Sequence, residues 1–423
     1  MTGQRIRAEI AIIHQLIMYG CIAVLEGRQM VRRGLLTDKN DRILIAICLF
    51  VFMFSLGCGI ASPIIPLYAG SLGASYIQIG MIGTAYGLVY AIGSLPLGRL
   101  SDRLGRKIIM VLGTVLCALA AAAYSIATTV NHIVLIRALD GLAWAAFWPS
   151  MEALTTDVSR ASAVGRAMGF STASYGAGFA LGSLLAGTLT SIFGYRYAFL
   201  FYLASSILAT VVGLMMVREP RIKTTTDQSA FSNTAFRSSG LRHRANLLAD
   251  LISMVFCVVL MTALTLLPVY AKGLGIGVFN IGVLMMLLWL GRITGFLSAG
   301  RISDKMDRKL VLTPSLVSVA VGSLLLAVSE TWWMLVLAVI VTGIGLGALL
   351  PVSVALISDY VPSSQRGLAM GMFETASAVG MMIGPAVGGV LAEQFDPSYP
   401  YLFCSVATVF CTLAVGIFLK KRR

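Results

Sequence analysis

Charged residues are scarce in this sequence. Asp, Glu, Lys and Arg make up 12% of its 423 residues, against about 25% in soluble globular proteins, so a water-exposed globular fold is excluded. Strand-like alternation of apolar and polar residues is also missing, which argues against an outer-membrane barrel. We find no P-loop, GxSxG or HExxH motif. The chain is therefore not expected to be an enzyme or to drive transport with ATP by itself.

Cysteine pairs with functional spacing are absent as well. Seven cysteines are scattered along the chain, most of them inside apolar runs, and none forms a CxxC or CxxH pattern. This spacing indicates neither a disulfide framework nor a metal site. We expect no metal and no cofactor, and we interpret the cysteines as small apolar packing residues.

Long apolar runs recur along the whole chain. A helix of about 20 apolar residues crosses about 30 Å of hydrocarbon. Runs of this length recur twelve times, at about 43–67, 75–97, 108–128, 132–155, 164–190, 196–217, 246–270, 278–299, 310–328, 332–358, 367–392 and 399–419. The sequence predicts an all-α polytopic membrane protein with 12 transmembrane helices.

The net charge of +14 is distributed unevenly over the loops. If the residues before 43 are cytoplasmic, basic side chains gather on that side of the membrane, in alternate loops, in residues 218–244 and after 419. The opposite side holds only Arg196 and Lys272. This asymmetry follows the positive-inside rule and predicts both termini in the cytoplasm. We therefore expect the charge to fix orientation in a bacterial-type cytoplasmic membrane and not to bind nucleic acid.

The two halves of the chain align after a shift of 202 residues. "PLYAGSLGASYIQIG" from Pro66 lies on "PVYAKGLGIGVFNIG" from Pro268, and "AMG" at 167–169 lies on "AMG" at 369–371. A constant offset over about 140 residues indicates an internal repeat. The sequence predicts two six-helix bundles, 43–218 and 245–420, joined by a polar, basic, Ser/Thr-rich cytoplasmic linker, 219–244.

Residues 1–42 fall outside the duplication. The apolar stretch "IAIIHQLIMYGCIAVL" is short for a span and has no clear small-residue cleavage site. We interpret the segment as a cytoplasmic or interfacial extension, with a thirteenth span or a signal-like extension as alternatives. A further hypothesis is that translation starts at Met30, since "MVRRGLLTDKNDR" resembles an ordinary cytoplasmic lead-in.

Two charged decapeptides occupy equivalent places in the two halves. "GRLSDRLGRK" begins at Gly98 and "GRISDKMDRK" at Gly300, each between two predicted spans on the cytoplasmic side. Gly98 is expected to let backbones pass closely, and Asp102 to pair with a nearby arginine or face a helix N-terminus. The basic residues are expected to anchor the turn at anionic headgroups. If the decapeptide only fixed the membrane topology, any basic loop would serve. The glycine, the aspartate and the Arg-Lys pair instead recur at the same spacing in the second half.

Glycines follow helical spacing in the fifth and eleventh predicted spans. Close approach of membrane helices depends on such small residues, and a proline bends one of the helices locally. Generic tight packing is the alternative, but we expect both ladders to line the faces where the bundles move against each other. The ladder residues are Gly178, Gly182 and Gly187, and Gly380, Gly384, Pro385, Gly388 and Gly389.

With these motifs, residues 43–420 resemble the major facilitator superfamily, in its 12-span drug:proton antiporter branch. The resemblance implies that the decapeptide is a gating latch, whose Asp102 engages the other half when the cytoplasmic side is closed. It also implies that the complete glycine pattern is an antiporter motif. That motif usually lies in the fifth span, where Ser183 and Ala186 depart from it here. The predicted latch comprises Gly98, Asp102, Arg103, Gly105, Arg106 and Lys107, and in the second half Gly300, Asp304, Arg308 and Lys309.

Ionisable residues inside predicted spans each cost at least about 2.5 kcal/mol. "RALDGLAWAAFWPSME" places Arg137 and Asp140 one turn apart on the helical face that also carries Trp144 and Trp148. The pair is either a structural ion pair or a proton site in which Arg137 biases Asp140. "RALDG" resembles a fourth-span motif of proton-coupled exporters, which implies that the arginine is linked to proton transfer.

Three further ionisable residues lie in or near the predicted spans. Glu374 is expected to be a proton site, a contact for cationic substrate or part of a structural salt bridge. Arg292 is expected to pair across the bundle interface or to contact an anionic substrate. Glu152, near the inner end of its span, is expected to be solvated.

Aromatic and thioether side chains dominate the predicted cavity faces, and they suit hydrophobic ligands of variable shape. Ordinary core or lipid-facing packing is the alternative for individual members. Sugar carriers need convergent Asn, Gln and acidic residues, which are almost absent from these spans. The predicted cavity residues are Phe54, Trp144, Phe147, Trp148, Met261, Arg292 and Met381.

The sequence therefore predicts a secondary active transporter with alternating access. The favoured function is export of lipophilic or cationic drug-like compounds in exchange for protons, by a chain that is expected to be monomeric in the bilayer. The first alternative is a proton-coupled or facilitative carrier of a specific metabolite or sugar. The second is a transporter-like membrane sensor.

Overall fold

A computed structural model describes residues 39–159, 164–217, 240–303, 306–362 and 365–419. All of its regular elements in these ranges are helices, and twelve of the helices are long and apolar enough to cross a membrane. The first six are α2 (Lys39–Ser71), α3 (Tyr76–Leu104), α4 (Arg106–Tyr124), α5 (Val130–Val158), α6 (Val164–Phe193) and α7 (Tyr195–Met216). The other six are α8 (Gly240–Gly273), α9 (Val278–Ser303), α10 (Arg308–Ala327), α11 (Trp332–Tyr360), α12 (Arg366–Gln394) and α13 (Tyr399–Phe418).

Each predicted apolar run corresponds to one of these helices, so the prediction of twelve spans is confirmed. The stretch 1–38 and the linker residues 218–239 lie outside the described residues, so the hypotheses about the N-terminal segment stay predictions. Helix α8 begins at Gly240, within the segment predicted as linker.

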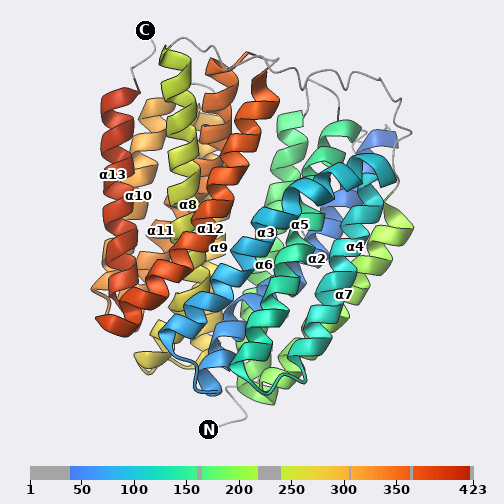
Figure 1. Ribbon diagram of the computed structural model, residues 1–423, viewed down its shortest axis with the longest axis vertical. Helices are drawn as coiled ribbons and strands as arrows, with labels where there is room; N and C mark the ends of the chain where they lie inside the picture. Colours follow the sequence, from blue (N-terminus) through green and yellow to red (C-terminus); the bar gives the residue numbers. More distant parts are fainter. Residues whose placement is uncertain (1–38, 160–163, 218–239, 304–305, 363–364, 420–423) are drawn as a thin grey trace.

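The helices form two groups that lie side by side in Figure 1, α2–α7 in blue to green and α8–α13 in yellow to red. Both groups use the same packing scheme, as the internal repeat predicts. In the first group the main helix pairs are α2–α6, α3–α5, α4–α5, α4–α7 and α2–α7; the matching pairs in the second are α8–α12, α9–α11, α10–α11, α10–α13 and α8–α13.

Helix ends and kinks also repeat at the 202-residue offset. Thr129 and its counterpart Thr331 accept hydrogen bonds from backbone N–H groups as N-caps of α5 and α11, which satisfies a donor that the helix leaves unpaired. Pro149 and its counterpart Pro351 lie inside the same two helices. The duplicated residues therefore build duplicated elements.

Between the groups, α3 packs against α12 and α6 against α9, and α2 meets α8. We use "inner" for the side predicted to be cytoplasmic, where α3 ends and α12 begins, and "outer" for the opposite side. At the outer end, the backbone N–H of Tyr76 donates to Oε2 of Glu393 at 2.7 Å. Toward the inner end, a Cβ added at Gly98, Gly169 or Gly371 would meet no atom within 4 Å. The two groups are thus tightly joined on the outer side.

Candidate functional site: a central cavity between the two helix groups

A cavity of about 110 Å³ lies between the two helix groups. Its wall combines aromatic, aliphatic and thioether side chains with a few ionisable groups. Ligand sites for drug-sized molecules are typically about 300–1,000 Å³. A ligand of that size therefore requires the two groups to separate further than they do in this structure.

Five of the seven predicted cavity residues line this space: Trp144, Trp148, Met261, Arg292 and Met381. Phe54 and Phe147 do not. Their rings stack on each other with centroids 3.7 Å apart, and both side chains are buried, 2% and 0% exposed. Because Phe54 also stacks on Trp144 at 5.6 Å, the two phenylalanines support the cavity wall from behind instead of forming it.

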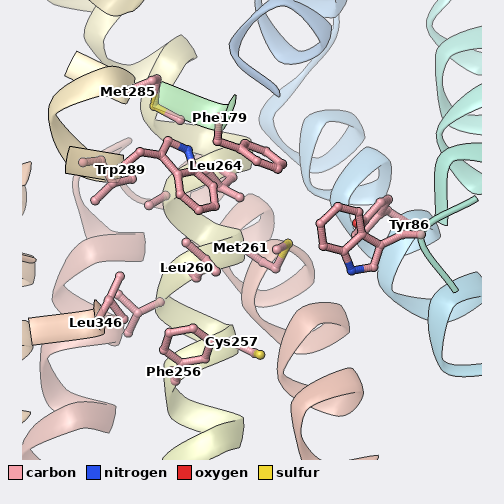
Figure 2. Close-up of a cluster of buried hydrophobic side chains, with 14 of the residues drawn as sticks. Tyr86, Phe179, Phe256, Cys257, Leu260, Met261, Leu264, Met285, Trp289 and Leu346 are labelled. Atoms are coloured by element: carbon pink, nitrogen blue, oxygen red, sulfur yellow. The ribbon is translucent and has the colours of Figure 1, made fainter. Parts of the chain in front are cut away.

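Helix α8 supplies much of the apolar wall. Figure 2 shows Phe256, Leu260 and Leu264 along this helix, with Met261 turned toward Tyr86 on the far side. All five residues are at least nine-tenths buried and belong to one hydrophobic cluster, and all of them line the cavity. The wall thus offers a continuous apolar surface with little hydrogen-bonding capacity.

Asp140 is the most fully hydrogen-bonded acid of the cavity. Its carboxylate accepts hydrogen bonds from the hydroxyls of Tyr124 and Tyr202, each at 2.9 Å, and pairs with Nη1 of Arg137 at 3.2 Å. Arg137 also lies over the ring of Tyr86, 4.5 Å from its centroid. Hydrogen bonds and a cation together compensate the cost of burying the charge. The network joins α5 to α3, α4 and α7, and its members line the cavity except for Tyr124.

Glu374 lies on the opposite side of the cavity, on α12. The hydroxyl of Tyr90, on α3, is 3.5 Å from its Oε2 and is oriented to donate across the two helix groups. Glu152, on α5, is close enough to interact electrostatically with Glu374 and lies beside Trp148. Glu152 is partly exposed, so the prediction that it is solvated is met only in part, because the side chain also lies near Glu374.

The latch residues of the first half bind within their own helix group. Asp102 pairs with Arg106 at 3.5 Å, and Arg106 pairs with Asp157 at the end of α5 at 2.8 Å. The ammonium group of Lys107 donates to the carbonyl oxygen of Leu214 at the end of α7, at 2.7 Å. Arg103 is exposed. The aspartate therefore lies near its arginine, as predicted, and its engagement with the other half stays a prediction.

The second latch repeats these contacts at the same offset. Arg308 pairs with Asp359 at 3.1 Å, and Lys309 donates to the carbonyl oxygen of Gly416 at 2.6 Å. Gly300 lies near the end of α9, and Asp304 lies outside the described residues. In both copies the Arg-Lys pair thus ties the loop to helices of its own group, where the sequence predicted contacts with lipid headgroups.

The two glycines of the first decapeptide have different surroundings. Gly105, between α3 and α4, has a backbone φ of +105°. Residues other than glycine rarely adopt this conformation. Its counterpart Asp307 has φ −59° and caps α10 by accepting a hydrogen bond from the backbone N–H of Lys309, which explains why no glycine is needed there. At Gly98 no atom lies within 4 Å of an added Cβ, so the predicted close approach is not found.

The glycine ladders serve two kinds of interface, whereas the sequence analysis expected both to line the faces where the bundles move against each other. Most of their glycines bring helices of one group together, α6 to α2 or α12 to α8: Gly178, Gly182, Gly380, Gly384 and Gly388. Only the outermost residues contact the other group. Gly187 lies against Gly282 of α9, and Gly389 and Pro385 lie against Gly80 and Gly83 of α3.

Tyrosines are the site residues that the sequence analysis missed. Tyr86, Tyr90, Tyr175 and Tyr202 line the cavity, and Tyr90 and Tyr202 hydrogen-bond to its acids. A polar hydroxyl at the tip of a large apolar ring needs a partner when it is buried. Tyrosine within an apolar span is therefore a signal that could have identified them.

Comparisons with known proteins agree with this architecture. The model of the family described as Major Facilitator Superfamily matches residues 47–309 and 293–423. Multidrug resistance protein 1 of Bacillus subtilis is 24% identical over 397 residues, covering 90% of this chain and 96% of that protein. Quinolone resistance protein NorA of Staphylococcus aureus is 23% identical over 373 residues, covering 86% and 94%. A crystal structure of a mutant of the nucleoside transporter NupG superposes with a TM-score of 0.74 at 16% identity, covering 89% of this chain and all of that one.

Proposed function

The chain belongs to the major facilitator superfamily, and we propose that it is a secondary active transporter that exports lipophilic or cationic drug-like compounds in exchange for protons. The observation that carries the proposal is the central cavity, in which an apolar aromatic wall surrounds a small number of buried charges. Such a wall accommodates hydrophobic ligands of variable shape, because its contacts are not directional.

The Arg137–Asp140 pair supports proton coupling. A proton on Asp140 would remove the negative charge that Arg137 and the hydroxyls of Tyr124 and Tyr202 now contact. Protonation would therefore weaken the contacts that join α4, α5 and α7, so that the proton and the packing of the first helix group are linked. Glu374 is proposed as a second acid that takes up and releases a proton during the same transport cycle.

The names of relatives support the substrate class. Two bacterial proteins that match most of this chain are called multidrug and quinolone resistance proteins. The likeness to a nucleoside transporter structure concerns the fold alone.

A carrier of one specific metabolite or sugar is the alternative. Recognition of such polar compounds needs several convergent hydrogen-bonding groups. Among the described residues that line the cavity there is no Asn and no Gln. This composition favours the drug-like class over the polar one.

We further propose a multi-pass protein of the bacterial cytoplasmic membrane, monomeric, with both termini cytoplasmic. The charge asymmetry of the loops supports this orientation. The domain boundaries 43–218 and 245–420 are proposed on the sequence repeat, and the repeated helix packing is consistent with them.

The proposal can be tested with inverted membrane vesicles loaded with acid, in which export from the cell becomes uptake into the vesicle. Adding ethidium, rhodamine 6G or tetraphenylphosphonium should collapse the pH gradient, observed as recovery of the fluorescence of an acridine dye. Vesicles without the protein serve as the control. The absence of any response over a broad panel of lipophilic and cationic compounds would contradict the proposal.

A further inference from the structure

Arg292 is a partly buried cation that pairs with no acid among the described residues. It lies on α9 and lines the central cavity, and its Nε and Nη1 atoms are inaccessible to solvent and donate to no acceptor in the described part of the chain. The guanidinium carbon lies 4.2 Å from the ring centroid of Trp289 and 5.5 Å from that of Phe256. The hydroxyl of Tyr175 is its polar neighbour. A charge in this position is costly unless an anion joins it.

The acids of the cavity are engaged elsewhere. Asp140 forms its ion pair with Arg137 and accepts two tyrosine hydrogen bonds, and Glu374 lies next to the hydroxyl of Tyr90. The guanidinium of Arg292 therefore has unused N–H donors at Nε and Nη1, and a planar guanidinium binds a carboxylate through charge-assisted hydrogen bonds.

The aromatic rings around Arg292 define the kind of molecule that fits. Trp289 and Phe256 hold the guanidinium by cation–π contacts, and a ligand would reach its Nε and Nη1 atoms only when the cavity is wider than in this structure. Phe179 stacks on Trp289 at 4.2 Å, and Figure 2 shows these two rings together with the α8 wall. Trp289 is buried behind the cavity wall, whereas Phe179, Phe256 and Tyr175 line the same cavity as Arg292. An acid group at Arg292 would thus be attached most favourably to a flat aromatic body that lies against these three side chains.

The opposite side of the cavity has the opposite charge. Tyr90 occupies in the first half the position that Arg292 occupies in the second, 202 residues apart, and it faces Glu374. Glu152 adds a second carboxyl group there, beside the aromatic ring of Trp148. One wall of the site is therefore suited to a cationic group and the other to an anionic group.

We propose that Arg292 is an anion subsite and that this cavity selects aromatic zwitterions, with the ligand carboxylate at Arg292 and its ammonium group at Glu374 and Glu152. The proposal rests on the proposed function and narrows its substrate class. A ligand with only a cationic group leaves Arg292 without a counter-ion, whereas a zwitterion supplies an opposite charge to both walls of the cavity.

The test is equilibrium binding to the purified full-length protein at pH 7.4, with three matched ligands. Norfloxacin carries a carboxylate and an ammonium group on a flat aromatic body; its methyl ester lacks the anion, and its N-acetyl derivative lacks the cation. We expect norfloxacin to bind at least about tenfold more tightly than either derivative, as a charge-assisted hydrogen-bonded pair requires. The acid-to-ester ratio should fall to about one in Arg292→Gln and be partly kept in Arg292→Lys.

Thr294→Ala is the matched control, because this residue lies on the same helix, is exposed, and its hydroxyl donates only to the carbonyl oxygen of Leu290 among the described residues. It should retain the wild-type ratio. Glu374→Gln should reduce the preference for norfloxacin over the N-acetyl derivative while the acid-to-ester ratio is kept.

Equal affinity of wild type for acid and ester would overturn the inference, and so would a wild-type ratio in Arg292→Gln. The wild-type comparison decides even where a variant fails to fold. Proton-coupled export of ethidium, which has no acid group, reports on the proposed function separately. Ethidium export together with equal acid and ester affinities contradicts only the zwitterion inference.

Discussion

At the scale of single residues, Asp140 is the buried charge to which we assign both a structural role and a proposed role in proton coupling. Its side chain is 4% exposed, and three partners on α4, α5 and α7 satisfy its oxygens. Its ion pair with Arg137 and the full strength of its two tyrosine hydrogen bonds depend on its being ionised. The same contacts make its protonation an event that the surrounding helices must accommodate.

Substituting Asp140 by Asn separates the two roles. The single variant leaves Arg137 buried without its counter-ion, a loss expected to cost about 3–5 kcal/mol. Proton-driven export of ethidium should fall to the background of empty vesicles. The double variant Arg137→Gln, Asp140→Asn removes both charges, so it should recover much of the thermal stability but no proton-driven export. Stability is measured by thermal unfolding in detergent, and export in acid-loaded vesicles.

If the pair is only structural, the double variant regains export along with stability, and the assignment of Asp140 to proton coupling fails. A carrier that works without titration of Asp140 would in addition keep its downhill flux in the single variant. Both results are observable in the same vesicles.

The sequence was informative about some of these residues and silent about others. The spacing of Arg137 and Asp140 on one helix predicts their contact, because residues three apart share a face. Tyr124 and Tyr202 lie 16 and 62 residues from Asp140 on other helices, and no local pattern indicates them. The sequence also could not place Glu152 near Glu374, because the two carboxyl groups lie on helices from different halves of the chain, α5 and α12.

At the scale of helices, small residues fix where the two groups meet. A Cβ atom added to Gly282 would lie 2.6 Å from the carbonyl oxygen of Ser183 and 2.8 Å from the Cα of Gly187. These neighbours are backbone atoms, which cannot move out of the way as side chains do. The outer contact of α6 with α9 therefore exists only because both helices present glycine.

Gly282→Val is expected to destabilise this closed outer contact by about 1–3 kcal/mol, the usual cost of overpacking. The population should shift toward a state in which the outer ends of α6 and α9 are further apart. Distances between spin labels at those ends, measured by pulsed electron resonance, report the shift. Gly371→Val is the control, since no atom lies within 4 Å of a Cβ added there; identical distances in both variants would rule out the packing argument.

Hydrophobicity alone located the helices, because length and apolar content decide whether a segment spans the bilayer. It could not assign the glycine ladders to an interface. Gly182 and Gly187 lie on one helix, yet the first faces α2 and the second faces α9. Glycine permits close approach to any partner, so only the three-dimensional arrangement tells which helix that partner is.

At the scale of the whole molecule, the duplication connects sequence to mechanism. Arg106 with Asp157 and Arg308 with Asp359 form the same ion pair in each half, and the Lys107 and Lys309 contacts repeat in the same way. Each half is thereby reinforced as a unit. Two such units with a glycine-lined contact between them are suited to move as bodies around a central cavity.

The repeat was visible in the sequence, and the fold followed from it with few errors. The differences between the halves were harder to interpret. Tyr90 and Arg292 occupy equivalent positions, but the consequence, a cavity with opposite charges on opposite walls, depends on which helices face each other across the interface. The opposite charges of the cavity thus come from positions at which the two halves of the chain carry different residues.

The central claim is that the two helix groups must separate on the outer side during transport. Tyr76 and Glu393 meet across that side, 2.7 Å between backbone nitrogen and carboxylate oxygen, so cysteines at both positions in a cysteine-free chain can be joined by a short, reducible bifunctional reagent. The matched control joins Tyr270 and Ser329, which contact each other within α8–α13. Cross-linking the first pair should abolish ethidium export, and reduction should restore it, whereas the control pair should transport throughout. Undiminished export with the first pair fully cross-linked would contradict the account.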